Sequence, residues 1–331
     1  MEKSIGNTGL RCPITSEHHD FFISLMDYRN KFYTSDQPEE VAKFYEDFDS
    51  LEELEEWRRE RPRGIPYLHE VEGDKEIIVV VPTSDYYGNY ARLCREEVFS
   101  GLHIIFVESG SKGDFYFNLE HYCNTGFKKA LEYNPKWIIY SNDDLVKLDD
   151  VNVLRRELSR IDHQTVSSVF ATPNNLHSFN MIAGISIPFV TNIAFLVYEC
   201  VFKREGRKLV RRVRSRYRNN LVITKFSLLR QLILRKKLYF LFTGDFVILS
   251  SRFVSANHGN VFDEAFINGQ EDYDLSVRLS LNKKDYAFIN YRVGGVSGAS
   301  LGNGPARRMR DIINSLYIAE KLGVGELHGK L

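Results

Sequence analysis

The chain has 331 residues, of which 43% are hydrophobic and 27% charged, proportions that are usual for a globular protein. Its 44 Lys and Arg residues balance 44 Asp and Glu residues, so no overall charge favours nucleic-acid binding. The four cysteines are far apart, which argues against a zinc site or a disulfide framework and fits a reducing compartment. The first residues lack the apolar core of a signal peptide. We therefore expect a cytoplasmic protein, built as one large α/β domain or as two small domains.

Residues 1–70 predict an N-terminal helical extension. One short helix is expected around Pro38, which suits a first helical turn. A second helix is expected to open at Ser50, because Glu53 follows three residues later in a capping-box pattern. Residues 59–75 are broken by prolines and glycines and predict a linker.

From residue 76 the sequence alternates between apolar runs and helical stretches. The runs EIIVVVPT, LHIIFVES and KWIIYS are typical of strands that are buried on both faces. Helices are expected between them, at about residues 87–100 and 118–133. This alternation predicts βαβ units, a largely parallel sheet and right-handed crossovers. All strand carboxyl ends then meet at one edge, which is where such sheets bind ligands.

The second half of the chain is less regular. TVSSVFAT predicts another strand, and a helix is expected to close the chain at about residues 305–322. Residues 181–198 form an uncharged, mostly apolar run that is only just long enough to span a membrane. Gly184, Pro188 and Asn192 interrupt this run, so we expect a buried or interfacial segment.

The strongest local feature is SNDDL, residues 141–145, directly after the third predicted strand. Two adjacent carboxylates and an amide are hard oxygen ligands that suit Mg²⁺ or Mn²⁺ shared with substrate phosphates. The alternative is purely structural: Asn142 and Asp143 form a turn and Asp144 caps the next helix. The motif alone leaves both interpretations open.

A second acidic feature opens the predicted helix EDYDLSVRLS, residues 271–280. Acidic residues in a first helical turn stabilise the helix through its dipole, so Glu271 and Asp272 have a structural explanation. The functional alternative is that one of these carboxylates is a general base that activates an acceptor hydroxyl.

Six motifs follow one another along the chain: PTS, ESGS, N-x-G at residues 124–126, SNDDL, GD at residues 244–245 and FDEAFINGQEDYDLSVRL. Together they resemble family-2 glycosyltransferases of the rhamnosyl- and glucosyltransferase kind. The resemblance covers about residues 76–325 and implies a GT-A domain, Rossmann-like with a mostly parallel central sheet. Residues 200–240 would be a basic amphipathic helical insertion in that domain.

The resemblance implies a metal-dependent, inverting transfer of a sugar from a UDP-, GDP- or dTDP-sugar to a glycan or lipid-linked acceptor. It assigns Asp272 as catalytic base with Glu271 beside it, and Asp144 as ligand of Mn²⁺ or Mg²⁺. Gly244 and Asp245 would lie beside the sugar or acceptor. The donor nucleotide would be bound by Pro82, Thr83, Asp85, Glu108, Ser109, Asn142 and Asp143.

One departure from the family pattern lies beyond the acidic helix. The segment YRVGGVSGASLGNG contains no His, although members often place one there to contact the metal or diphosphate. Its glycines would allow a closing loop. Ser300 and Arg307 are the candidates for diphosphate contact. The alternative for such an arginine is a solvated helix face.

Residues 203–218 carry nine Lys and Arg residues and a single acidic residue, Glu205. With the following segment they predict two basic amphipathic helices across residues 203–237, a pattern typical of membrane surfaces. We expect peripheral contact with the inner face of an anionic membrane, or else packing on the main domain or another subunit. A non-catalytic glycosyltransferase-like binding module is the alternative function. A nucleotidyltransferase is disfavoured, because PTSDYYGNYARL lacks the glycine-rich segment that such enzymes need.

Overall fold

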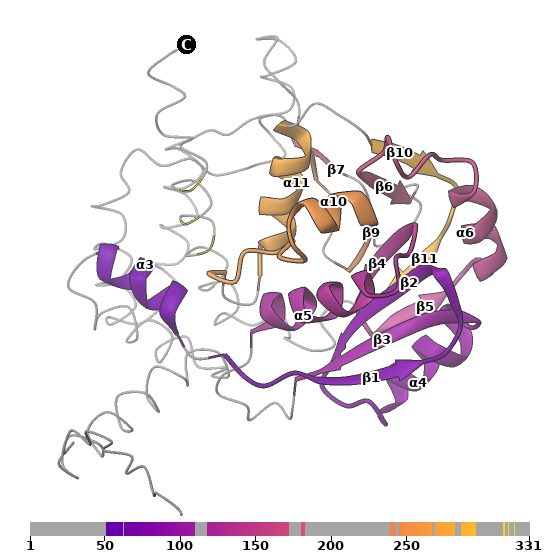
Figure 1. Cartoon of the computed structure of the whole chain (residues 1–331), viewed down its shortest axis with the longest axis horizontal. Coiled ribbons are helices and arrows are strands. Elements are labelled where there is room, and N and C mark those ends of the chain that lie inside the picture. Colours follow the sequence, from indigo (N-terminus) through magenta and orange to yellow (C-terminus); the bar gives the residue numbers. More distant parts are fainter. Residues whose placement is uncertain are drawn as a thin grey trace, which may run out of the picture.

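The structure is a computed structural model that describes eight stretches of the chain and three single residues. These parts are residues 51–61, 63–109, 118–171, 180–182, 239–241, 245–266, 269–281 and 286–295, together with Asn314, Tyr317 and Lys321. In these parts the chain forms an α/β fold around a seven-stranded sheet (Figure 1). The basic segments at 203–237, most of the apolar run at 181–198 and most of the expected closing helix lie outside the described residues.

The central sheet has the strand order β1-β3-β2-β4-β9-β6-β10. Its strands are β1 (Tyr67–Val71), β2 (Asp74–Thr83), β3 (Leu102–Glu108), β4 (Trp137–Ser141), β6 (Ser168–Ala171), β9 (Phe246–Ser250) and β10 (Tyr286–Ile289). β2 pairs in parallel with β3 and β4, and β6 with β10. The other three pairings are antiparallel, because β1 joins one edge in reverse and β9 runs in reverse between β4 and β6. The sheet is therefore mixed: five strands run in one direction and β1 and β9 run in the other, so the expectation of a mostly parallel sheet is met only in part.

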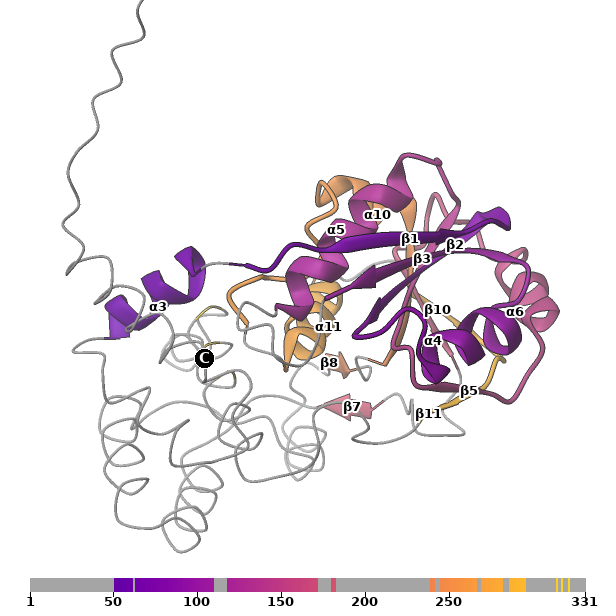
Figure 2. The same cartoon turned by 90° about the horizontal axis from the view of Figure 1, so that it is seen from below.

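Helices cover both faces of the sheet (Figures 1 and 2). One face carries α4 (Asn89–Leu93), the π-helical turn η1 (Cys94–Val98) and α6 (Val151–Leu158). The other carries α5 (Leu119–Leu131), α10 (Ser251–Ala256) and α11 (Glu271–Leu281). Helix α3 (Leu51–Glu60) precedes the sheet. Two short antiparallel pairs complete the fold: β5 (Leu145–Lys147) with β11 (Val293–Gly295), and β7 (Asn180–Ile182) with β8 (Tyr239–Leu241).

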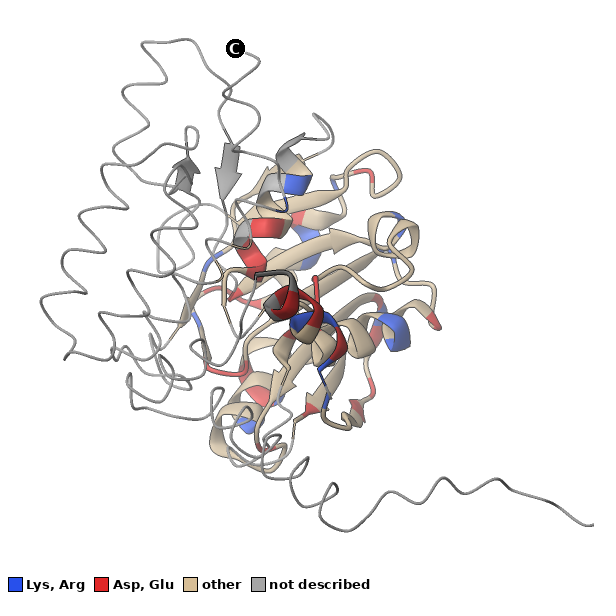
Figure 3. Ribbon diagram, turned by 90° about the vertical axis from the view of Figure 1, so that its left-hand side faces the viewer, with Lys and Arg blue, Asp and Glu red and all other residues tan. Residues whose placement is uncertain are grey.

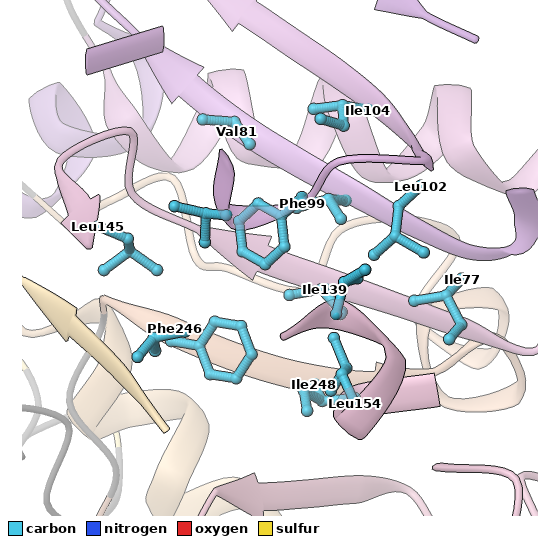
Figure 4. Packing of buried hydrophobic residues seen from close by; sticks show 14 of the residues in the cluster. Ile77, Val81, Phe99, Leu102, Ile104, Ile139, Leu145, Leu154, Phe246 and Ile248 are labelled. Atoms are coloured by element: carbon cyan, nitrogen blue, oxygen red, sulfur yellow. The ribbon is translucent and has the colours of Figure 1, made fainter. Parts of the chain in front are cut away.

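Alternation along the buried strands builds two separate cores. In β2, Ile77, Val79 and Val81 face α4 and α6, whereas Ile78 and Val80 face α5 and α11. Figure 4 shows the first core, in which Ile139 lies between Phe99 and Leu154. Burial on both faces explains why these strands are continuous apolar runs in the sequence.

Most of the local predictions are confirmed. The three apolar runs form β2, β3 and β4, and α3, α5 and α11 lie where helices were expected. Asn118 caps α5 by accepting a hydrogen bond from the backbone N–H of His121 at 2.8 Å. The linker expected at residues 59–75 is wrong in part, because residues 67–71 form β1. β1 is a half-exposed edge strand, so it lacks the apolar run that identifies buried strands. In the parts of the chain that the structure describes, no helix has both the length and the apolar character needed to cross a membrane.

Candidate functional site

The loops after β2, β3 and β4 meet at the carboxyl edge of the sheet. Thr83 lies at the end of β2 beside Glu108 at the end of β3. The Thr83 carbonyl accepts a hydrogen bond from the backbone N–H of Ser109 at 3.0 Å. The Thr83 hydroxyl donates to Asp143 Oδ2 at 2.7 Å. One buried threonine therefore ties together the loops that follow three neighbouring strands.

Asp245 reaches the same edge from a distant part of the chain. Because β9 runs antiparallel to β4, the residue before β9 lies beside the residue after β4. The backbone N–H of Asn142 donates to the Asp245 carbonyl at 3.0 Å, and Asn142 Nδ2 donates to Asp245 Oδ1 at 3.2 Å. The Asn142 amide is oriented by the Tyr140 hydroxyl, which donates to Asn142 Oδ1 at 2.9 Å.

Asp144 occupies a turn between β4 and β5 and is 8% exposed. The structural alternative for this residue is wrong, since the cap of the next helix, α6, is Asp150. The Asp144 carboxylate receives no hydrogen bond or ion pair from another side chain in the described parts of the chain. Burial raises its pKa to about 6, and the negative charges of Asp143 and Asp245 add to the increase. Burial also raises the pKa of Asp143, against the hydrogen bond from Thr83.

These carboxylates fit a divalent cation in charge and in donor type. They repel one another, and a cation would relieve that repulsion. Across the residues that the structure describes, no three His, Cys, Asp or Glu side chains are arranged to hold a metal ion. The protein could therefore supply one or two ligands, which is the arrangement that Mg²⁺ adopts when substrate phosphates complete its coordination. Asp144 is the residue best suited to this contact.

The carboxylates of α11 are linked to this edge by their electrostatic effect on Tyr140. Glu271 is buried and Asp272 is partly exposed, both in the first turn of the helix. The pKa of Tyr140 is raised chiefly by burial, and the negative charges of Glu271, Asp245 and Asp272 contribute. The Tyr140 hydroxyl thus lies within electrostatic reach of both the SNDDL edge and the start of α11. Figure 3 shows acidic segments, red, at several places on the ribbon, with basic segments, blue, among them.

Glu108 makes contacts within the protein. Its Oε2 lies 2.8 Å from His69 Nε2, and its Oε1 accepts a hydrogen bond from the backbone N–H of Tyr86 at 3.2 Å. The His69 ring stacks on the Tyr86 ring with 4.1 Å between centroids. Pro82 is buried at the end of β2, and Asp85 is exposed and accepts a hydrogen bond from the backbone N–H of Tyr87 at 3.0 Å.

The structure therefore brings the predicted site residues that follow β2, β3 and β4 to one edge with Asp245, whereas Glu271 and Asp272 are linked to that edge only by their electrostatic effect on Tyr140. Gly244, Ser300 and Arg307 lie outside the described residues. Sequence reasoning missed His69 and Tyr140. His69 falls in the expected linker, whereas Tyr140 is visible as a polar aromatic residue at the end of an apolar strand.

Neither a scan against protein-family models nor a search of curated proteins finds a match to this chain.

Proposed function

We propose that the chain is a metal-dependent, inverting glycosyltransferase with a GT-A fold. In this proposal it moves a sugar from a nucleotide-sugar donor to a glycan or lipid-linked acceptor. The observation that carries the proposal is the hydrogen-bonded meeting of three motifs far apart in the sequence. Thr83 contacts Asp143, and Asn142 contacts Asp245, all at the carboxyl edge where open α/β sheets bind ligands.

The donor would lie across this edge. Asp144 would hold Mn²⁺ or Mg²⁺, which when bound stabilises the negative charge that develops on the departing diphosphate. Thr83 and Asn142 keep Asp143 and Asp245 in fixed positions around Asp144. Such preorganised positions favour transition-state stabilisation, because little reorganisation is needed during the reaction.

The acceptor would lie on the α11 side. An inverting displacement needs a base on the face opposite the leaving group, and the α11 carboxylates would supply that base. Asp272, the more exposed of the α11 pair, would accept the proton of the acceptor hydroxyl. The buried Glu271 would support it from within the helix.

The alternative is a non-catalytic glycosyltransferase-like module at a membrane or partner surface. It is favoured by the inward contacts of Glu108, whose oxygens are held by His69 and the Tyr86 backbone. Residues 203–237 would contact an anionic membrane in the catalytic proposal, and a membrane or a partner in the alternative. Only the catalytic proposal requires that a nucleotide-sugar be consumed when an acceptor or water is present.

The test is a thermal-shift and turnover screen with UDP-, GDP- and dTDP-sugars, each with and without Mn²⁺. We expect one donor to raise the melting temperature only when Mn²⁺ is present. The shift should disappear in Asp144→Asn and persist in Glu97→Gln, which removes an exposed carboxylate on η1. Metal-dependent binding without any sugar release would favour the binding module. Absence of binding by every donor would refute both forms of the nucleotide-sugar proposal.

A further inference from the structure

An arginine of the N-terminal extension, Arg61, binds the main chain of the segment that precedes α11. Arg61 follows α3 and is 3% exposed. Its Nη2 donates to the Phe266 carbonyl at 2.7 Å and to the Glu264 carbonyl at 3.2 Å. The two acceptors lie five and seven residues before Glu271, the first residue of α11. A buried guanidinium that donates to main-chain carbonyls fixes the path of this segment, since losing it would leave buried polar groups unsatisfied.

Glu264 fastens the same segment to the N-terminal extension and to α5. Its carboxylate lies 2.6 Å from Arg63 Nε and 3.3 Å from His121 Nδ1, and it accepts from Asn124 Nδ2 at 3.1 Å. Its carbonyl accepts a further hydrogen bond from Asn118 Nδ2 at 3.1 Å.

Residues near the end of the chain hold the segment from another side. Asn314 is fully buried, and its Nδ2 donates to the Gly269 carbonyl at 2.9 Å. Tyr317 packs edge-on against Phe266, with 5.0 Å between ring centroids, and donates to Asp263 Oδ2 at 2.8 Å. Contacts from both ends of the chain therefore converge on the residues just before the α11 carboxylates.

The backbone at the end of this segment is strained. Gln270 has a φ of +67°, a left-handed conformation that non-glycine residues rarely adopt. Its carbonyl nevertheless accepts the hydrogen bond from the Asp274 N–H, which closes the first turn of α11. Strain of this kind persists only where surrounding contacts impose it, and it is common at functional sites. Here it lies immediately before Glu271 and Asp272.

We propose that Arg61 and Asn314 are positioning residues for the α11 carboxylates, acting through the main chain of residues 264–266 and 269–270. The inference rests on the proposed function and adds that the N-terminal extension is part of the acceptor-side machinery. A base must lie within hydrogen-bonding distance of the proton that it removes, and a displacement of about 1 Å can cost a factor of about 10² in rate. Loss of either residue should thus affect turnover and leave the donor site unchanged.

The test compares Arg61→Met and Asn314→Ala with Arg156→Met, a control at an exposed arginine on α6. We expect kcat for sugar transfer to fall about 10- to 100-fold in the first two variants, with donor affinity within about twofold of wild type. Adding Gln270→Gly to Arg61→Met should recover part of kcat, because glycine adopts the left-handed conformation without strain. Recovery distinguishes positioning from general loss of structure.

Each of three results would overturn the inference. These are a normal kcat in both variants, a loss of donor affinity as large as the loss of kcat, and no recovery of kcat when Gln270→Gly is added. Failure of the proposed function has a different signature, namely a wild-type protein that transfers no sugar. Amide hydrogen exchange tests directly whether Arg61 holds the start of α11 in place. Exchange across residues 271–275 should be faster in Arg61→Met than in Arg156→Met, and equal exchange in the two variants would overturn the inference whatever the activity.

Discussion

Two groups of carboxylates in this molecule differ in how their charge is balanced. At the SNDDL edge, neither Asp143 nor Asp144 forms an ion pair with a described residue, and burial with neighbouring negative charge raises the pKa of Asp144 to about 6. Beneath α11, Glu264 faces Arg63 and His121, and its pKa falls to about 2 despite burial. Lys321 likewise lies 2.7 Å from Asp263 and lowers the pKa of that carboxyl.

The difference separates a structural role from a ligand-binding one. A carboxylate that is paired with a cationic side chain contributes to stability, and its charge is already neutralised before a ligand arrives. A buried carboxylate that lacks one costs stability, and proteins keep such residues where function requires them. The following predictions test this division, starting with the largest effect.

The largest effect is expected at the proposed base. Asp272→Asn keeps the volume of the side chain and removes its basicity. We expect kcat to fall about 10²- to 10⁴-fold with donor affinity nearly unchanged, because the base acts on the acceptor in the transition state. Steady-state kinetics with a separate donor titration measure both quantities. Near-normal turnover in Asp272→Asn together with an inactive Glu271→Gln would exchange the two roles.

Among the carboxylates that face a cationic side chain, Glu264 should give the largest loss of stability when it is replaced by Gln. It leaves Arg63 and His121 without their shared carboxylate, and we expect the free energy of unfolding to fall by about 3 kcal/mol. Denaturant unfolding measures the change. The control is Glu96→Gln, which breaks the exposed pair with Arg92 and should cost less than about 1 kcal/mol. Equal costs for the two variants would contradict a special role for Glu264.

Glu120 is a third case, in which a proton balances the charge. Burial raises its pKa to about 8, although Arg61 opposes the increase. The folded protein then keeps a proton that the unfolded chain releases near the ordinary pKa of 4.5, so stability falls as pH rises from about 4.5 to 8. Glu120→Gln removes this loss. Its stability relative to wild type should therefore rise steadily across that window, as measured by unfolding at both pH values. A difference that stays constant with pH would refute the raised pKa.

The smallest effect is expected at Asp144, where the substitution is stabilising, as it is for Glu120→Gln. Asp144→Asn removes one of several repelling charges, so we expect the free energy of unfolding to increase by about 1 kcal/mol at pH 7. The folded-state pKa of about 6 is above the ordinary value of 3.8, so the gain should be absent near pH 4 and complete above pH 6. A loss of stability at pH 7 would mean that the Asp144 charge is balanced within the protein, as that of Glu264 is. It would weaken the assignment of Asp144 as metal ligand.

The parts of the fold that were predictable are those with a local signal. β2, β3 and β4 are continuous apolar runs because helices cover both of their faces. β1 has no such signal, since Tyr67 and Leu68 are exposed on an edge strand. The direction of β9 was also unpredictable, because the same run FVILS suits a parallel or an antiparallel strand.

The candidate site divides in the same way. Asp144 and the α11 carboxylates stand out as motifs, whereas the contact between Asn142 and Asp245 exists only because β9 is reversed. The roles of Arg61 and Asn314 depend on contacts more than 40 residues apart in the sequence, and no local pattern marks them.

The reversal of β9 also bears on how this protein can change over evolutionary time. β6 runs in the same direction as β4, so it ends at the carboxyl edge, and β9 begins at that edge beside it. The chain between residues 171 and 245 therefore leaves and rejoins the sheet at neighbouring points. Closing a longer excursion between fixed points costs only a logarithmic increase in entropy. A change in the length of that stretch is therefore compatible with unaltered β2, β3 and β4 and with the residues at their ends.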